Sequence, residues 1–519
     1  MSTTIGVAES QHPIRVTNRT PNKSRFRKLF LIAGISITIF IVGAVLCFKY
    51  WPFSEEAVRQ DLAETSDSTV TIRSYHPTYF PPGCTLEGVE FRHGPNNFKL
   101  ITVNKLVVEG SYVGILTQHV HRITAIGAHV YIPPFGSNVQ FHSQHSNLAV
   151  DELVANGTDV EFTSANKHTG SFAFDVHEAL LRNVRWGSPI QYRLKLHNPN
   201  PPGEISAEGN FGAWADGHPQ DTPMSGVYKF EHADLGVYGG IGGILSSTGK
   251  FDGVFKHINV SGTTDTPDFV VTSGGHKHSL STHFDAYVDA MRGDTFLNRV
   301  EAHLGRTTII AEGSIAGSGG TKGKAANLHF ISRHGRIEDI LGLFVTAPRS
   351  PMSGDLVFVA RAQPAHHDQP FLESVKLKAK FGIDDGSFKP ETQKDVDALS
   401  AGARGQNKDD PETVVSDLKG AVDLSGGVAH FSDMEFSVPG AKAHLHGTYN
   451  VVNHGINLHG DMQVDTKISK TSSGAKALLL KIMDPLFRKK KKGEIVPVHI
   501  LGTYEKPQFG LDFTNKEKR

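Results

Sequence analysis

Histidine is the residue type in this sequence best suited to metal chemistry, and some of the 28 histidines stand two residues apart. These pairs are His119/His121, His276/His278 and His444/His446. On a β-strand, residues two apart share one face, where two imidazoles can bind one metal ion. A site also needs a third ligand and supporting groups, and no cysteine or carboxylate cluster accompanies the pairs. The sequence therefore predicts no metal site and places these histidines on solvent-facing strands.

A glycine-rich segment, residues 239–250 (GGIGGILSSTGK), superficially has the composition of a phosphate-binding loop. That loop requires four residues between its glycines and a hydroxyl residue directly after the lysine. Here five residues separate Gly243 from Gly249, and Phe251 follows Lys250. No nucleophile elbow, zinc-protease helix or Cys/His catalytic motif occurs either. The sequence predicts no catalytic residue, no cofactor and no enzymatic activity, with an envelope enzyme as a distant alternative.

Composition narrows the class of protein further. Acidic and basic residues balance at 53 each, so there is no electrostatic case for nucleic-acid binding by the whole chain. The two cysteines cannot pair with each other, because Cys47 lies in an apolar segment and Cys84 lies outside it. We therefore expect a fold without disulfide bonds, in which Cys84 is a small buried apolar residue.

The elements that must position any functional residue are predicted to be β-strands. Residues 455–464 alternate apolar and polar side chains, which is the period of a strand with one buried face. The same alternation occurs at 128–132, 300–304 and 443–445, and glycine-rich turn signals separate such segments. Short helices are expected at 55–63, 234–238, 336–345 and 392–400. The fold class is therefore mainly β, with a few short helices.

One segment differs in kind, because residues 29–48 (LFLIAGISITIFIVGAVLCF) contain no charge. Twenty helical residues span about 30 Å, the hydrocarbon thickness of a bilayer. The predicted membrane anchor includes, with aromatic rings at its boundary, Leu29, Phe30, Phe40, Phe48, Tyr50 and Trp51. A cleaved signal peptide and a lipoprotein are the alternatives. Against them stand the long polar N-terminal tail, the length of the apolar segment, the lack of a cleavage site and the bulky Leu46 before Cys47.

Charges on either side of this segment predict its direction. Six basic residues and one acidic residue precede it, whereas five acidic and two basic residues occur in 49–67. Because positive residues remain on the cytoplasmic side, the N-terminus is expected in the cytoplasm and the large body across the membrane.

Near the C-terminus, residues 473–487 (SGAKALLLKIMDPLF) predict an amphipathic helix. A basic cluster follows it directly: Arg488, Lys489, Lys490, Lys491 and Lys492. Such a cluster beside an apolar helix can bind anionic lipid headgroups. The alternative is a helix packed on the end of the sheet, followed by a solvated run of charge.

Several segments resemble the bacterial AsmA-like family. They are 51–62 (WPFSEEAVRQDL), 75–91 (YHPTYFPPGCTLEGVEF), 101–116 (ITVNKLVVEGSYVGIL), 122–134 (RITAIGAHVYIPP), 436–464 (FSVPGAKAHLHGTYNVVNHGINLHGDMQV), 484–487 (DPLF) and 495–511 (IVPVHILGTYEKPQFGL). They cover both ends of the body. The N-terminal tail is longer than is usual in the family, and the chain is short for a relative that bridges two membranes.

The resemblance implies a single-pass anchor in the inner membrane of a Gram-negative envelope and a periplasmic body. It implies an elongated, curved, mostly antiparallel β-sheet folded into a groove, and a role in phospholipid transport and outer-membrane biogenesis. The implied partners are phospholipid and membrane, with envelope proteins as further partners and no nucleic acid. Residues on the apolar faces of the predicted strands are then candidates to line the groove: Ala128, Val130, Ile132, Val300, Leu304, Leu445, Ile456, Leu458, Met462 and Val464.

The expected organisation has six parts. These are a disordered basic tail (1–28), the membrane helix (29–48), an N-terminal AsmA-like β region (49–225), middle β repeats with short helices (226–400), a polar loop (401–411) and a C-terminal AsmA-like β region (412–519). An open groove would cover its apolar face with lipid tails, whereas a closed sandwich would cover it with a second sheet. The alternative function is a structural assembly factor for outer-membrane proteins, which would bind partners at open strand edges.

Overall fold

The structure is a computed structural model of the whole chain. It describes residues 51–94, 97–132, 148–162, 172–215, 218–272, 274–317, 324–345, 348–363, 371–404, 412–464, 494–504 and 506–511. The chain divides into two compact units, Met1–Val58 and Arg59–Arg519. The whole sheet belongs to the second unit. Within the described ranges, no helix is both long enough and apolar enough to cross a membrane. The predicted anchor up to Tyr50, the helix 473–487 and the basic cluster 488–492 lie outside the described residues.

The first half of the sheet is built mostly from long strands. Its strands are β1 (Thr69–Thr71), β2 (Ser74–Thr78), β3 (Gly83–His93), β4 (Phe98–Gly110), β5 (His119–Ile132), β6 (Ala149–Phe162), β7 (Phe172–Arg185), β8 (Ile190–Pro199), β9 (Pro202–Phe211), β10 (Pro223–Asp234), β11 (Ile241–Gly242), β12 (Ile244–Val254) and β13 (His257–Val271). Cys84 in β3 is 1% exposed, which confirms its expected burial.

The second half of the sheet consists of strands β14 to β25, which are also mostly long. Its strands are β14 (His278–Asp289), β15 (Asp294–Leu304), β16 (Thr307–Gly317), β17 (Lys324–Arg336), β18 (Met352–Gln363), β19 (Lys376–Phe388), β20 (Ser416–Ser425), β21 (Val428–Val438), β22 (Ala441–Asn450), β23 (Gly455–Val464), β24 (Glu494–Thr503) and β25 (Pro507–Leu511). The alternating segment 455–464 coincides with β23, and the mainly β fold class is confirmed.

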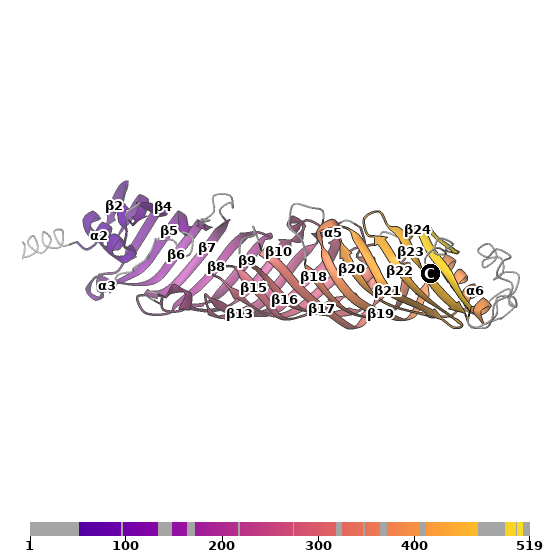
Figure 1. Cartoon of the computed structure of the whole chain (residues 1–519). Helices are drawn as coiled ribbons and strands as arrows, with labels where there is room; N and C mark the ends of the chain where they lie inside the picture. The colour runs from indigo at the N-terminus through magenta and orange to yellow at the C-terminus, as the bar shows by residue number, and fades with distance from the viewer. Residues whose placement is uncertain are drawn as a thin grey trace, which may run out of the picture. The chain divides into compact units, whose positions relative to one another are not determined.

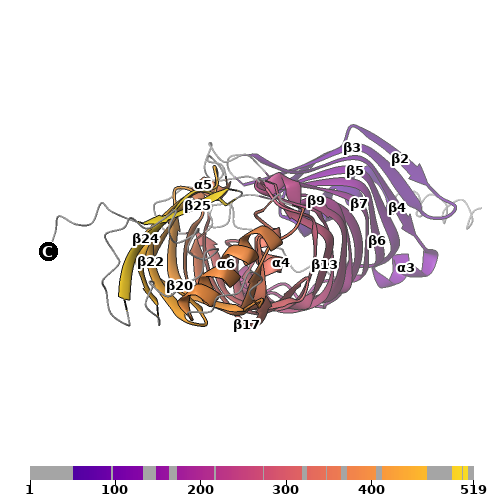
Figure 2. The ribbon, with the colours of Figure 1, turned by 90° about the vertical axis from the view of Figure 1, so that its right-hand side faces the viewer.

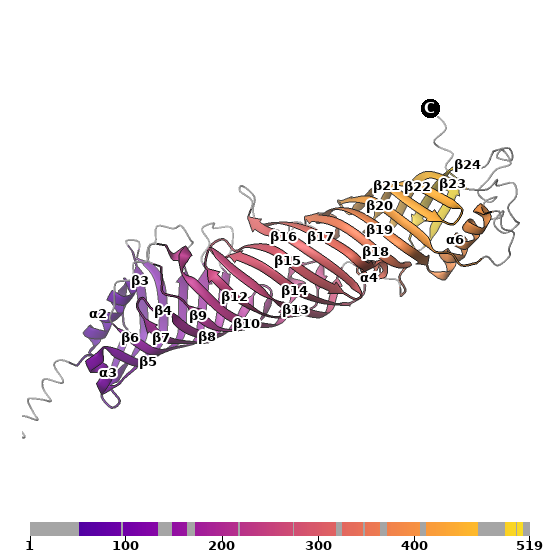
Figure 3. The same cartoon turned by 90° about the horizontal axis from the view of Figure 1, so that it is seen from below.

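These strands form one large, curved, open sheet in which most strands pair antiparallel with the next one along the chain. Figure 1 and Figure 3 show them following one another from β3 to β24. At the N-terminal edge β1 and β2 both pair with β3, and further on β10 pairs with β12 and β11 with β13. One pair among the described strands, β5 with β6, is parallel.

Short helices interrupt the strands. They are α2 (Glu55–Ser66), α3 (Tyr112–Thr117), η1 (Pro219–Asp221), η2 (Leu235–Tyr238), α4 (Ile337–Gly342), α5 (Phe371–Ser374) and α6 (Pro390–Ala403). The structure confirms the helices expected at 55–63, 234–238, 336–345 and 392–400, with shifts at their ends. The sequence did not predict α3, α5 or η1.

Two of the helices lie on the concave side of the sheet. Figure 2 looks along the sheet and shows the strands curving around α4 and α6. Helix α6 contributes Val396 and Ala403 to a buried cluster with side chains of β21, β22 and β23. Helix α4 packs Ile337 and Ile340 against Leu356 of β18 and its neighbours. The apolar face of the sheet is therefore the face on its concave side.

Candidate functional site

The apolar face is organised in rows that cross the strands. Partners in adjacent strands point to the same face, so following the register from strand to strand traces each row. The first apolar row runs through 21 strands, one residue in each, and contains only apolar residues, glycine and one tyrosine. Its members are Leu86, Leu106, Ala125, Ala155, Ala179, Leu194, Ala207, Tyr228, Gly249, Gly262, Phe284, Val300, Ala311, Phe330, Ala360, Ala379, Val422, Phe431, Gly447, Leu458 and Ile500.

A second apolar row lies beside the first and crosses the same strands. It also contains no charged residue. Its members are Cys84, Val108, Ile123, Leu153, Leu181, Tyr192, Gly209, Gly226, Phe251, Val260, Ala286, Leu297, Gly313, Leu328, Ala362, Leu377, Leu424, Ala429, Tyr449, Ile456 and Gly502. The two rows form a continuous apolar band along the sheet.

Tyrosines fill the band where it is lined by glycine. A Cβ added at Gly226 would lie 2.6 Å from the Tyr192 hydroxyl, and one at Gly249 would lie 2.8 Å from the Tyr228 ring. The Tyr192 hydroxyl donates to the carbonyl oxygen of Ser225 at 3.3 Å. Burial raises the pKa of Tyr192 to about 12, so this side chain is uncharged at neutral pH. The aromatic rings therefore cover the glycine backbone without placing a charge in the band.

The opposite face is mostly polar and carries ladders of ion pairs. Glu152 of β6 accepts from Arg122 at 2.5 Å and from Arg182 at 3.3 Å, which joins three strands. Glu435 of β21 pairs with Lys442 at 2.8 Å and with Lys419 at 2.9 Å. These lysines lower the pKa of Glu435 to about 2, because their charges and hydrogen bonds favour its ionised form. The sheet thus separates one charged face from one apolar face.

Exposure along the band divides it into regions. At the N-terminal end Leu86, Leu106 and Ala125 are buried. From β6 to β15, every member of the first row from Ala155 to Val300 is partly exposed. In the second row the same strands carry partly exposed side chains, except for the buried Ala286. We call the band between β6 and β15 the open stretch, because large apolar side chains there remain accessible.

At the C-terminal end, helix α6 covers the part of the apolar face beside the band, whose own members there, apart from the buried Ala429, are partly or fully exposed. Phe431, Leu458 and Ile500 of the first row pack against the buried cluster to which α6 contributes. Polar contacts also fix the helix. Buried Asp397 accepts from the Gln393 amide at 2.7 Å and from the Val414 backbone N–H at 2.9 Å. We call this end of the sheet, from β21 to β24, the covered end.

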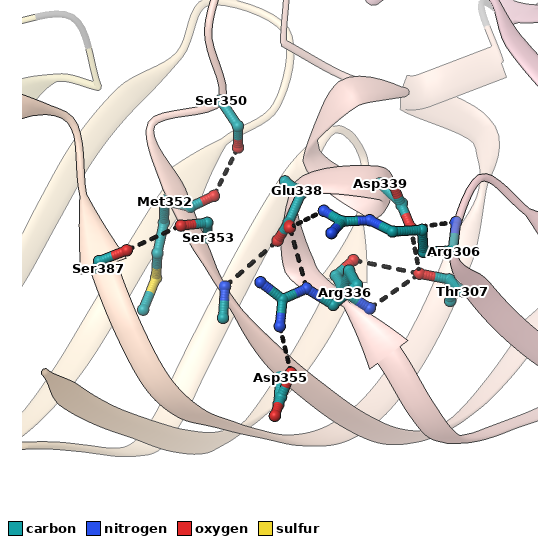
Figure 4. A network of polar contacts seen from close by, with 11 residues as sticks. Arg306, Thr307, Arg336, Glu338, Asp339, Ser350, Met352, Ser353, Asp355 and Ser387 are labelled. Carbon is teal, nitrogen blue, oxygen red and sulfur yellow. Dashed lines mark hydrogen bonds and ion pairs between the residues drawn. The ribbon is translucent and has the colours of Figure 1, made fainter.

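Helix α4 is fixed between these regions by a network of polar contacts, which Figure 4 shows from close by. The Glu338 carboxylate accepts from Arg306 at 2.5 Å and from Arg336 at 3.0 Å, and Arg336 also pairs with Asp355. Asp339 accepts from the Thr307 hydroxyl at 2.8 Å. Because these contacts reach β16, β17 and β18, they hold α4 on the apolar face where the open stretch ends.

The candidate groove-lining residues fall into different regions. Val300 lies in the open stretch, and Leu458 and Ile456 lie in the rows. Ala128 and Leu304 are buried, whereas Val130 and Ile132 are partly exposed. Three candidates belong to the buried cluster at the covered end: Leu445, Met462 and Val464. Of the anchor candidates, Trp51 alone is among the described residues.

The histidine pairs lie mostly at the surface. His121, His276, His444 and His446 are exposed. His119 and His121 both approach Asp151, each at 3.5 Å. Across the described ranges, no group of three or more His, Cys, Asp or Glu side chains is placed to hold a metal ion.

Sequence reasoning missed most of the open stretch. The signal was present in residues 190–196, where Ile190, Tyr192, Leu194 and Leu196 alternate with polar residues. Neighbouring strands give weaker signals, because glycine and alanine occupy many band positions in β9 and β12.

An uncharged band of this length can cover apolar molecules. It has the properties of a binding surface for hydrocarbon. Comparisons with models of protein families, with curated proteins and with solved structures found no match to this chain. The functional argument therefore rests on the sheet itself.

Proposed function

We propose that this protein binds phospholipid by its acyl chains along the apolar band and transfers it along the sheet. The observation that carries the proposal is the pair of unbroken apolar rows, accessible through the open stretch. A sheet with one apolar face must cover that face. In the proposed groove, lipid tails cover it, and the headgroups remain in water along the open side.

The energetics suit a chain-like apolar ligand. Each acyl methylene removed from water contributes about 0.8 kcal/mol, so burying many methylenes of an acyl chain adds up to a large favourable free energy. Neighbouring strands lie about 4.8 Å apart, so 21 strands extend over roughly 100 Å. That is longer than an acyl chain, and the band therefore suits a path for lipid rather than a pocket for one molecule. Selectivity should be low, because acyl chains offer no hydrogen bonds to recognise.

The surroundings of the groove follow from the sequence. The uncharged segment 29–48 anchors the chain in the inner membrane, and the charge pattern around it places the sheet in the periplasm. In this position a lipid groove supports outer-membrane biogenesis, as the resemblance to AsmA-like proteins implies. Arg488–Lys492 remain candidate headgroup contacts after the helix 473–487.

The test is native mass spectrometry of the full chain, extracted gently from the membrane. Val300→Asp places a charge in the open stretch. The matched control is Val359→Asp, on the opposite face of β18, where Val359 is 47% exposed. We expect bound phospholipid in the natural protein and in the control, and a large loss of it in Val300→Asp, with all three proteins folded.

A folded full chain without lipid would contradict the proposal, as would equal lipid loss from both variants. Cross-links to one specific outer-membrane protein, unaffected by Val300→Asp, would instead support the alternative function of an assembly factor.

A further inference from the structure

A separate apolar surface lies at the N-terminal end of the sheet, outside the band. Two connections form it, the turn between β2 and β3 and the helix α3 between β4 and β5. Phe80 and Leu116 are each 85% exposed, and Val113 is 72% exposed. Together with the less exposed Tyr79 and Tyr112, these residues make up what we call the N-terminal patch. Exposed apolar groups gathered in this way mark interaction sites.

The patch is preformed. The rings of Phe80 and Tyr112 lie 5.8 Å apart, and the Tyr112 hydroxyl donates to the Tyr79 carbonyl oxygen at 2.6 Å. The Gly110 backbone N–H donates to the Pro82 carbonyl oxygen at 2.8 Å, which joins the two connections. Because these contacts fix both segments, the apolar side chains remain at the surface rather than folding back over each other.

The chemistry of the patch suits the boundary between headgroups and acyl chains of a bilayer. Residues 77–86 and 110–118 contain no charged side chain, so inserting them removes no charge from water. Tyrosine and phenylalanine beside aliphatic side chains are the residues that favour this depth, because their rings are apolar and the hydroxyls reach water.

The length of chain before the sheet limits how far the start of the sheet can lie from the membrane. Phe48 ends the apolar segment and Thr69 begins β1, with 20 residues between them. Twelve of these form α2, which is about 18 Å long. The other eight can span at most about 28 Å. The sheet therefore begins within roughly 46 Å of the bilayer surface, if residues 29–48 are the anchor.

We propose that the N-terminal patch inserts into the membrane that holds the anchor and seats the start of the sheet against its periplasmic leaflet. The inference rests on the proposed membrane anchor and adds a second, independent contact with the same bilayer. It does not depend on lipid being bound along the band.

The experiment uses the full chain reconstituted in vesicles of phosphatidylethanolamine and phosphatidylglycerol. A polarity-sensitive fluorophore is attached at Leu116→Cys, in a protein that also carries Cys47→Ala. Cys84 stays unlabelled, because it is buried and its pKa is raised to about 12. The matched control is Val452→Cys, in the turn between β22 and β23, where Val452 is 50% exposed. Lipids carrying a nitroxide near the headgroup serve as quenchers.

We expect the label at position 116 to shift to the blue and lose most of its emission to the nitroxide lipids, while the label at 452 does neither. Equal behaviour of the two labels, or no quenching at 116, would overturn the proposal. A blue shift at 116 that grows with protein concentration and is not quenched would also overturn it, because a second copy would then cover the patch.

A second variant separates insertion from folding. Val113→Glu together with Leu116→Glu should leave the circular dichroism spectrum unchanged, since both side chains are exposed. A label at Phe80→Cys should be quenched in the natural background and lose its quenching in this double variant. Quenching that persists would contradict insertion of the patch. Neither outcome changes whether mass spectrometry detects lipid on the band. Insertion of the patch and lipid binding along the band can therefore be disproved independently.

Discussion

The same two apolar rows run through the open stretch and the covered end, but the packing around the rows differs between these regions. At the covered end, Leu458 and Ile500 pack against a buried cluster that includes residues of α6. In the open stretch, Leu194 and Val300 occupy the same row, and all four side chains are partly exposed. Neither residue type nor exposure along this row therefore distinguishes the two regions. The covered end differs by the buried cluster beside the row, to which α6 contributes.

Polar contacts hold α6 and α4 on the apolar face. Asp397 and Gln393 belong to α6 and join it to the backbone at Val414. Helix α4 is joined to three strands by Glu338 and Asp339. The described residues therefore include a buried core beside the rows at the covered end, and large, partly exposed apolar side chains in the open stretch.

The largest contrast is expected from shortening one leucine in each region. Leu445→Ala creates a cavity in the buried cluster at the covered end and should lower the free energy of unfolding by about 2–5 kcal/mol. Leu297→Ala removes a side chain that is already partly exposed and should cost about 1 kcal/mol in the lipid-free protein. Hydrogen exchange of the surrounding strands measures both effects locally. Equal losses at the two positions would remove the distinction between the regions.

A smaller effect on the free energy of unfolding is expected from removing a polar contact that holds helix α6. Asp397→Ala leaves the Val414 N–H without its acceptor and should cost about 1–3 kcal/mol, because that group is held in a buried network. Hydrogen exchange in α6 should become faster while exchange in β13 stays unchanged. The control is Asp395→Ala, an exposed residue of the same helix. If both variants exchange alike, the network does not hold α6 in place.

The smallest effect concerns the polar face. Because the pKa of Glu435 is about 2 in the folded protein and near 4.5 when unperturbed, its ion pairs stabilise the fold above pH 4.5. This contribution is lost as the pH falls from about 4.5 to about 2. Glu435→Gln should therefore lower stability at pH 7 by less than about 1 kcal/mol and make no difference near pH 2. Urea unfolding at several pH values measures it.

The control for that experiment is Glu87→Gln, an exposed residue of β3. It should leave the stability at pH 7 nearly unchanged. A stability difference for Glu435→Gln that is the same at pH 7 and pH 2 would contradict the assignment of its ion pairs.

Some of this architecture follows from local sequence, and some does not. Strand β23 is visible as a pattern because polar residues occupy every second position, and α4 and α6 are visible because helical periodicity is local. The continuity of the rows is not local. It depends on the register of each strand pair and on irregularities such as the shift between Asp285 and Ala286.

The local sequence also does not show which strand residues a helix will cover. Leu458 and Met462 were predicted as groove-lining residues with the same reasoning as Val300, because all three have apolar strand neighbours. The structure places Met462 in the cluster with α6 and Val300 in the open stretch. Nothing local to β23 records that a helix from between β19 and β20 packs over it. The N-terminal patch was missed for a related reason, since α3 is too short to show a helical period.

Photocrosslinking from the open stretch tests the central claim most directly. A diazirine amino acid replaces Leu297 in the full chain within a Gram-negative membrane, and the control position is Val357, 44% exposed on the opposite face of β18. After irradiation, mass spectrometry should find phospholipid attached at position 297 and not at 357. No lipid adduct at 297, or equal adducts at both positions, would contradict a lipid-covered apolar band.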